Sequence, residues 1–166
     1  ITGLSPSFQK IASGFRFVEG PVWIKEKDLL IFSDIMGNAL YSWSEKEGSK
    51  LYRPNSFLAN GNTLDREGRL ITCEHGASRV SRTDMESDTY SVLADKYNGM
   101  ALNSPNDVVV KSNGDVYFTD PLPGRSSKVG IPRQQELSFQ GIYRLDAASG
   151  KLDILDDSFS LPNGLC

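Results

Sequence analysis

Short apolar runs separated by Gly-rich and Asn-rich turns recur along the whole chain. In "SPNDVVVKSNGDVYFTDP" (104–121), an apolar run, an Asn-Gly turn and a second strand-like run predict a β-hairpin. The stretch "GIYRLDAASGKLDILDD" (141–157) adds an alternating strand, a polar turn and another short strand. Because no segment has the apolar spacing of an amphipathic helix, the pattern predicts an all-β protein built from units of about four short strands.

The same template occurs three times and begins a fourth time. When residues 59–74 are set against residues 104–121, Asn60 falls on Asn106, and residues 19–34 fit the template with Glu19 at that place. A fourth copy begins at "LPNGLC", where Asn163 takes the same position. Units of four antiparallel strands and roughly 40 to 57 residues are typical of β-propeller blades.

The repeats predict one partial propeller domain over residues 1–166. Its complete blades are expected at about 19–58, 60–104 and 106–161. Residues 1–18 are expected to supply a strand that completes the last blade of the ring, and residues 163–166 to start the next blade. Since propellers close with about four to eight blades, we expect the remaining half of the ring to come from the rest of the protein. The insertion at 121–140, rich in Gly, Pro and Ser, is expected to be a loop over one face of the ring.

The repeated position indicates a metal site. The innermost strands of a propeller surround a central channel, so Glu19, Asn60, Asn106 and Asn163 should form a ring of side-chain oxygens. Such a set suits Ca²⁺, which takes about six to eight oxygen ligands, whereas Zn²⁺ prefers Cys and His, and the chain has two Cys and one His. Asn residues here could equally serve only backbone turns. Glu19 favours the metal, because Glu is a poor turn former and needs a partner inside a channel.

Charge and hydropathy narrow the class of protein. The formal net charge of −3 gives no electrostatic reason to expect nucleic acid or an anionic membrane as a partner. No apolar stretch approaches the roughly 18 residues of a membrane span. We therefore expect a soluble protein, cytoplasmic or periplasmic, and the start at Ile1 leaves open whether a leader precedes it.

Four motifs carry a resemblance to a known family. "FVEGPVW", "CEHGASRVSR", the 104–121 stretch and "LPNGLC" resemble the SMP-30/gluconolactonase (regucalcin-like) family, whose members are six-bladed β-propellers similar also to diisopropyl fluorophosphatase. The resemblance implies that Glu19, Asn106 and Asn163 hold a divalent metal. The oxygen donors make Ca²⁺ the expected ion, with Zn²⁺, Mg²⁺ and Mn²⁺ as alternatives. The resemblance also implies that an Asp serving as a further ligand and as base or nucleophile lies beyond Cys166, so no catalytic residue is assigned.

The resemblance implies a metal-dependent hydrolase that opens a sugar lactone, a small-molecule substrate, by polarising its carbonyl for attack by water. Asn60 and His75 are the candidates for substrate binding, although a lone His can also be structural. Asp34 and Asp120, at matching strand ends, are expected to pair with loop amides. Two alternatives remain: a phosphotriesterase-like hydrolase with the same metal, and a non-catalytic propeller that binds partners. Strictosidine synthase-like propellers share the architecture, so the fold alone does not choose.

Overall fold

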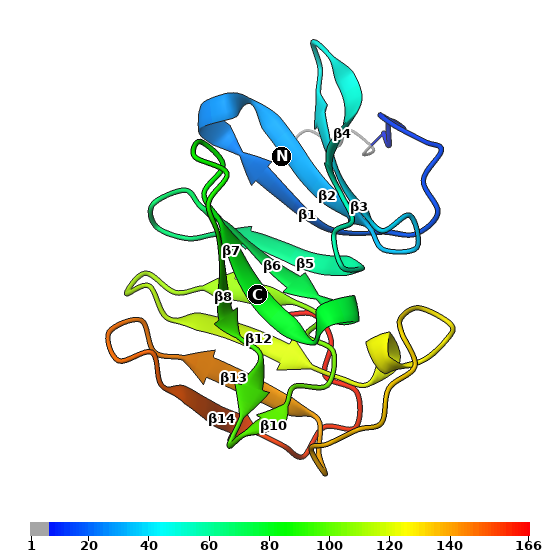
Figure 1. Cartoon of the computed structure of the whole chain (residues 1–166). Helices are drawn as coiled ribbons and strands as arrows, with labels where there is room; N and C mark the ends of the chain where they lie inside the picture. The colour runs from blue at the N-terminus through cyan, green and yellow to red at the C-terminus, as the bar shows by residue number, and fades with distance from the viewer. Residues whose placement is uncertain (1–6) are drawn as a thin grey trace.

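Three four-stranded antiparallel sheets follow one another along the chain in the computed structural model, which describes residues 7–166 (Figure 1). The first sheet consists of β1 (Val18–Ile24), β2 (Leu29–Asp34), β3 (Ala39–Ser44) and β4 (Gly48–Pro54). The second consists of β5 (Ala59–Leu64), β6 (Leu70–Glu74), β7 (Arg79–Thr83) and β8 (Tyr90–Ala94). The third consists of β11 (Val108–Val110), β12 (Val116–Asp120), β13 (Gly141–Leu145) and β14 (Leu152–Asp156). A two-stranded hairpin, β9 (Lys96–Tyr97) and β10 (Met100–Ala101), follows the second sheet.

In each sheet the strands are paired in chain order, so β1, β5 and β11 are edge strands at equivalent positions. β5 lies against both β1 and β11, which makes these three strands the innermost of their sheets. This is the arrangement of successive propeller blades. The all-β propeller prediction is therefore confirmed for the three blades of this chain.

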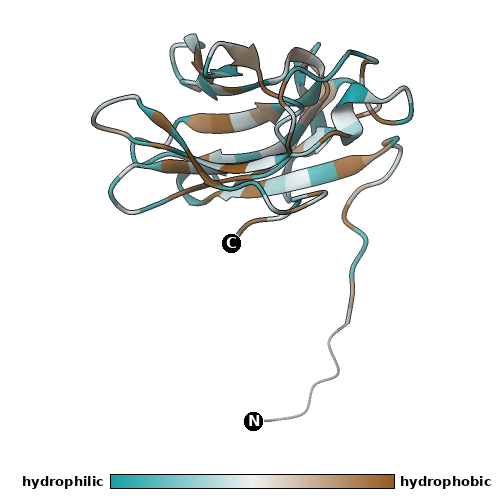
Figure 2. Cartoon of the chain, turned by 90° about the horizontal axis from the view of Figure 1, so that it is seen from below, coloured by the Kyte–Doolittle hydropathy of each residue, from teal (hydrophilic) through white to brown (hydrophobic). Residues whose placement is uncertain are grey.

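The apolar cores lie between adjacent blades. Ile24, Ile31 and Leu40 of the first blade form one cluster with Ala59 and Leu70 of the second. A larger cluster fills the space between the second and third blades and contains Ile71, Cys73, Val80, Ala94, Leu102, Val108, Val116, Phe118, Leu137, Tyr143 and Leu145. Each blade thus buries apolar surface against its neighbours, and Figure 2 shows the hydrophobic residues along the strands and the hydrophilic ones mostly in the loops.

Polar contacts also join the innermost strands. Asn62 of β5 donates from Nδ2 to Gly20 O of β1 at 2.9 Å and to Ser33 Oγ of β2 at 2.8 Å. Ser33 Oγ donates in turn to Asn60 O at 2.6 Å. On the other side of β5, Gly61 N donates to Asn106 O at 2.8 Å. These bonds satisfy backbone groups of edge strands that no sheet partner reaches.

The second strand of each blade ends in a carboxylate, and these carboxylates serve two kinds of contact. Asp34 accepts hydrogen bonds from the backbone N–H groups of Arg16, Phe17 and Gly37. Asp120 accepts one from Asn103 N at 2.7 Å. The prediction that Asp34 and Asp120 pair with loop amides is confirmed.

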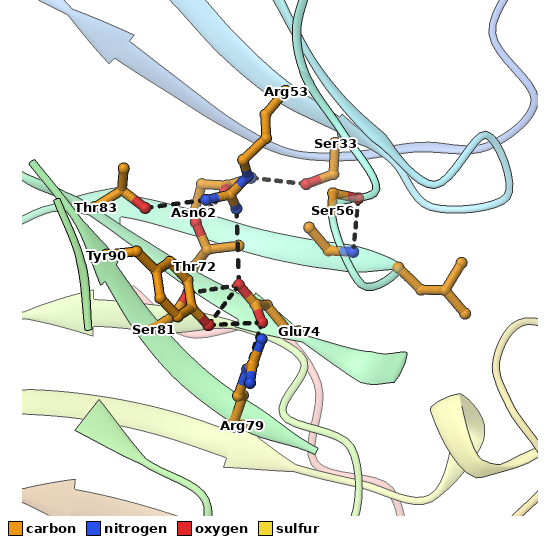
Figure 3. Close-up of polar contacts among 12 residues, drawn as sticks. Ser33, Arg53, Ser56, Asn62, Thr72, Glu74, Arg79, Ser81, Thr83 and Tyr90 are labelled. Atoms are coloured by element: carbon orange, nitrogen blue, oxygen red, sulfur yellow. Dashed lines mark hydrogen bonds and ion pairs between the residues drawn. The ribbon is translucent and has the colours of Figure 1, made fainter. Parts of the chain in front are cut away.

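Glu74, which has one more methylene than Asp, reaches side chains instead. Its fully buried carboxylate accepts from Arg79 Nε and Ser81 Oγ, both at 2.7 Å, and lies 3.7 Å from Arg53 of the first blade (Figure 3). Tyr90 O–H completes the group at 3.2 Å. The network therefore links β4 of the first blade to β6, β7 and β8 of the second.

Three short 3₁₀ helices complete the described secondary structure: η1 (Lys25–Lys27), η2 (His75–Ala77) and η3 (Pro123–Arg125). The insertion at 121–140 contains η3 and is otherwise irregular, and it contacts the second blade through η2. Residues 7–17 form no strand, and residues 1–6 lie outside the described part of the chain. The predicted pairing of residues 1–18 with the last blade of a closed ring therefore stays a prediction. Over residues 7–166, no helix is long and apolar enough to cross a membrane.

Candidate functional site

The starts of the innermost strands surround a pocket of about 450 Å³. All four side chains at the repeated sequence position line it: Glu19, Asn60, Asn106 and Asn163. They come from β1, from β5, from the segment that enters β11, and from the segment 163–165 that follows the third blade. The structure therefore brings together the residues that the repeat pattern selects, because equivalent positions on successive blades face the same axis.

Backbone contacts hold these strands close enough to form one pocket. Gly20 has φ +55°, and a Cβ there would lie 2.1 Å from Asn60 O. A Cβ at Gly61 would lie 2.7 Å from Asn106 O. Both positions therefore require glycine, and their close backbone approach fixes the spacing between the pocket residues.

Three of the pocket residues have side-chain oxygens that are not engaged with the protein. Within residues 7–166, no hydrogen bond or ion pair involves the Glu19 carboxylate, the Asn106 amide or the Asn163 amide. Asn106 is 7% exposed, whereas Glu19 and Asn163 are exposed. The Asn106 amide is not among the fully buried polar atoms without a partner, so all three side chains are accessible to a ligand in the pocket.

This donor set fits a hard divalent cation, because one carboxylate and two amide oxygens are ligand types that Ca²⁺ accepts. In the described part of the chain, no cluster of three or more His, Cys, Asp or Glu side chains could hold a metal ion. A site at this pocket would therefore depend on asparagine oxygens and on ligands that these blades do not supply. Metal ligation by Glu19, Asn106 and Asn163 stays a prediction.

Asn60 and His75, the predicted substrate-binding pair, are in direct contact. Asn60 Nδ2 lies 3.0 Å from His75 Nε2. Asn60 lines the pocket, but His75 is only 2% exposed and lies behind Asn60 rather than on the pocket wall. Burial, reinforced by the charge of Arg133, lowers the pKa of His75 to about 4, so its imidazole is neutral at pH 7.

Asp107 is a further pocket residue, which the repeat pattern did not predict. Its Oδ1 accepts from Val108 N at 3.0 Å, and its Oδ2 accepts from Leu165 N at 2.9 Å. Together with the bond from Thr119 Oγ1 of β12 to Asn163 O at 2.7 Å, this contact holds the segment with Asn163 against the third blade. The sequence feature that could have indicated this role is the pair Asn106-Asp107 directly before the apolar strand. Asp107, the second residue of the pair, is placed to anchor the start of the next repeat.

Comparisons with known proteins agree with the motifs. A family model described as the SMP-30/Gluconolactonase/LRE-like region matches residues 17–166. The chain is 30% identical over 178 residues to a gluconolactonase of Zymomonas mobilis, an alignment that covers 99% of the chain and 49% of that protein. The chain therefore spans about half the length of this curated relative.

Solved structures give the same result. A gluconolactonase of Xanthomonas campestris superposes with a TM-score of 0.81 at 33% identity, covering 86% of the chain and 48% of that protein. An X-ray structure of a candidate gluconolactonase has a TM-score of 0.88 at 32% identity, covering 94% of the chain and 54% of that protein. The calcium-binding protein regucalcin of Agrobacterium tumefaciens, at 13% identity and a TM-score of 0.65 over 89% of the chain and 45% of that protein, shares the fold.

Proposed function

The chain belongs to the SMP-30/gluconolactonase/LRE-like family, and from this we propose that the protein that carries it hydrolyses a sugar lactone in the pocket formed by its innermost strands. Two gluconolactonases, one known from its sequence and one from its structure, are 30% and 33% identical to the chain. The fold alone would not select this reaction, because propellers carry many functions. The pocket residues supply the second line of support.

The observation that carries the proposal is the set of unengaged oxygens of Glu19, Asn106 and Asn163 on one pocket. In our proposal these residues hold a divalent cation, with Ca²⁺ preferred because all donors are hard oxygen atoms. The bound cation would polarise the lactone carbonyl and stabilise the negative charge that develops on its oxygen. The only carboxylate among the three residues is Glu19, which therefore supplies the charge that retains the cation.

The other pocket residues orient the substrate and shape the site. Asn60 presents an amide group that can bond a hydroxyl of the sugar ring. Asp107 is an unsuitable base, because its two carboxylate oxygens already accept backbone hydrogen bonds that fix the pocket wall. No residue of the described chain is assigned as the group that takes the proton from water.

The reaction has a simple balance. A water oxygen bonds to the carbonyl carbon, the ring C–O bond breaks, and the released alkoxide oxygen takes a proton to become a hydroxyl group. The product is a hydroxy acid, which ionises and releases one proton at neutral pH. Acid release is therefore a direct measure of turnover.

The test uses the full-length protein that carries this chain, with glucono-δ-lactone in a pH-stat and with uncatalysed hydrolysis subtracted. We expect acid release that a chelator abolishes and that added Ca²⁺ restores. Chelator-resistant lactone hydrolysis would refute the metal site but keep the reaction. Hydrolysis of diisopropyl fluorophosphate without lactone hydrolysis would favour the phosphotriesterase alternative, and folded protein without activity on either substrate would favour a binding module.

A further inference from the structure

The single histidine of the chain lies between the pocket and the insertion at 121–140. His75 is the first residue of η2, directly after β6, and it is 2% exposed. It does not line the pocket, but its Nε2 lies 3.0 Å from the amide nitrogen of Asn60, which does. A buried imidazole in contact with a pocket residue can act on the substrate only through that residue.

The chemistry of the contact fixes the direction of the hydrogen bond. An amide nitrogen carries two protons and no acceptor, so Asn60 Nδ2 donates and His75 Nε2 accepts. The imidazole proton must then lie on Nδ1, a buried atom with no hydrogen-bond partner among residues 7–166. This contact uses one Nδ2 proton, and Asn60 Oδ1, which has no hydrogen-bond partner among residues 7–166, is the acceptor that remains for the pocket.

The insertion fixes His75 from the other side. Arg133 donates from Nη2 to His75 O and to Ser78 Oγ, both at 2.7 Å, and from Nη1 to Gly76 O. Gly124 packs on the imidazole so closely that a Cβ there would lie 2.7 Å from His75 Cγ. The exclusion of water and the Arg133 charge both oppose a second proton on the ring, so the cation, in which Nε2 would be a donor, is disfavoured.

We propose that His75 is a positioning residue whose Nε2 lone pair holds the Asn60 amide with Oδ1 toward the pocket, where Oδ1 accepts a hydrogen bond from a hydroxyl group of the sugar lactone. This inference rests on the proposed lactonase function and deepens it. An amide oxygen only accepts, so the arrangement selects lactones that carry a hydroxyl over lactones of the same ring size that lack one. The insertion contributes to the same arrangement, because Arg133 and Gly124 hold the His75 imidazole in place.

The first experiment measures the tautomer of His75 by ¹⁵N NMR on untagged full-length protein, and it is independent of activity. The signals of His75 are those lost in His75→Gln. We expect an Nε2 resonance typical of an unprotonated nitrogen and an Nδ1 resonance typical of a protonated one, with the Nε2 resonance shifted in Asn60→Ala. A protonated Nε2 would overturn the proposal, because Asn60 Oδ1 would then face the imidazole.

The second experiment compares kinetics on glucono-δ-lactone and on δ-valerolactone, which has no hydroxyl group. His75→Leu removes the acceptor and should raise KM for gluconolactone roughly threefold to tenfold, with kcat little changed. The KM for δ-valerolactone should stay within twofold of the wild type. His75→Gln offers an amide oxygen as acceptor and should restore most of the loss.

The double variant separates an effect through Asn60 from a general loss of structure. In the Asn60→Ala background, His75→Leu should cause no further change in KM, because the group that His75 orients is absent. Equal losses on both substrates, additive losses in the double variant, or an unchanged KM in His75→Leu would each overturn the proposal. If the wild type hydrolyses no lactone, the proposed function fails, and the NMR result still decides whether His75 orients Asn60.

Discussion

At the scale of single residues, the pocket contains a carboxylate and two amides that form no bonds with the described protein and one amide that is held by a histidine. This division corresponds to two tasks. Glu19, Asn106 and Asn163 are available to a cation, whereas Asn60 is fixed in one orientation. Substitutions at the two kinds of position should therefore have different signatures.

Replacing Glu19 by Gln keeps the shape of the side chain and removes its charge. Because Glu19 is the only carboxylate among the three predicted ligands of this chain, Glu19→Gln should weaken Ca²⁺ binding roughly tenfold or more, measured by isothermal titration calorimetry, and lactone hydrolysis should fall with it. Glu19 is exposed and unpaired within the described structure, so the melting temperature without Ca²⁺ should be unchanged. Glu26→Gln, an exposed position outside the pocket, is the control and should change neither. Retention of full Ca²⁺ affinity in Glu19→Gln would remove Glu19 from the ligand set.

Asp120 should make stability depend on pH. Burial raises the pKa of this fully buried carboxyl to about 7, against an ordinary value near 3.8 that applies in the unfolded chain. The folded state therefore binds more protons between those two values, and the free energy of unfolding should fall as pH rises through this window. From pH 5 to pH 8 the loss should be on the order of 2 kcal/mol.

The measurement is urea unfolding of the wild type and of Asp120→Asn at pH 5 and pH 8. Asp120→Asn should not show this fall in the free energy of unfolding between pH 5 and pH 8. The other titrating groups are the same in both proteins, so their contributions cancel in the comparison. Asp156→Asn is the control, because hydrogen bonds from Ser158 lower the pKa of Asp156 below this window. An equal pH dependence in the wild type and in Asp120→Asn would contradict the assignment.

At the scale of elements, the blade starts are fixed by close backbone contacts between β1, β5 and the segment that leads into β11. The Glu-Gly-Pro motif illustrates this. Gly20 combines a left-handed backbone with a contact that leaves no room for a side chain, and it directly follows the pocket residue Glu19. The glycine is therefore needed for the shape of the pocket as well as for stability.

Gly20→Ala should destabilise the protein by about 3 kcal/mol or more, because the cost of a left-handed alanine adds to the clash with Asn60 O. Gly68→Ala is a matched control, since Gly68 has φ +76° but open space around its Cβ position. It should lose only about 1–2 kcal/mol. The two values come from chemical denaturation, and similar losses in both variants would show that Gly20 is not limited by packing.

At the scale of the whole molecule, the first and third blades lie at opposite ends of the blade series (Figure 1). The large apolar side chains with exposed fractions of 47–61% include several on these two end blades and the segments beside them, namely Ile11, Val18, Trp23, Leu155, Phe159 and Leu161. In a closed propeller every blade packs between two neighbouring blades, which cover such apolar surfaces. The relatives are about twice as long as the chain, so a longer protein would have sequence to cover both ends.

The chain 1–166 by itself should therefore bind a hydrophobic dye such as ANS, with several-fold more fluorescence than a longer form that supplies further blades. The physical reason is that neighbouring blades exclude the dye from the end faces. Leu155→Lys should reduce dye binding to the isolated chain and leave its circular dichroism spectrum unchanged. Equal dye binding by the two forms would show that further blades do not cover these faces.

The sequence by itself determined the blades and most of the pocket. The alternation of a strand and the residues of a turn depend only on neighbouring positions, so both can be recognised from the sequence alone. The Asn113-Gly114 turn is an example. The repeat then placed Glu19, Asn60 and Asn106 at one position without any knowledge of contacts, because equivalent positions in a propeller face one axis.

Only the tertiary structure decided the places of His75, Asp107 and Arg133. His75 is buried because an insertion far along the chain packs over it, and Asp107 matters because it anchors the start of the next repeat. These contacts join residues 58 positions apart. Side-chain pairing over such separations depends on how the blades and loops pack together, and the periodicity of a strand contains no information about it.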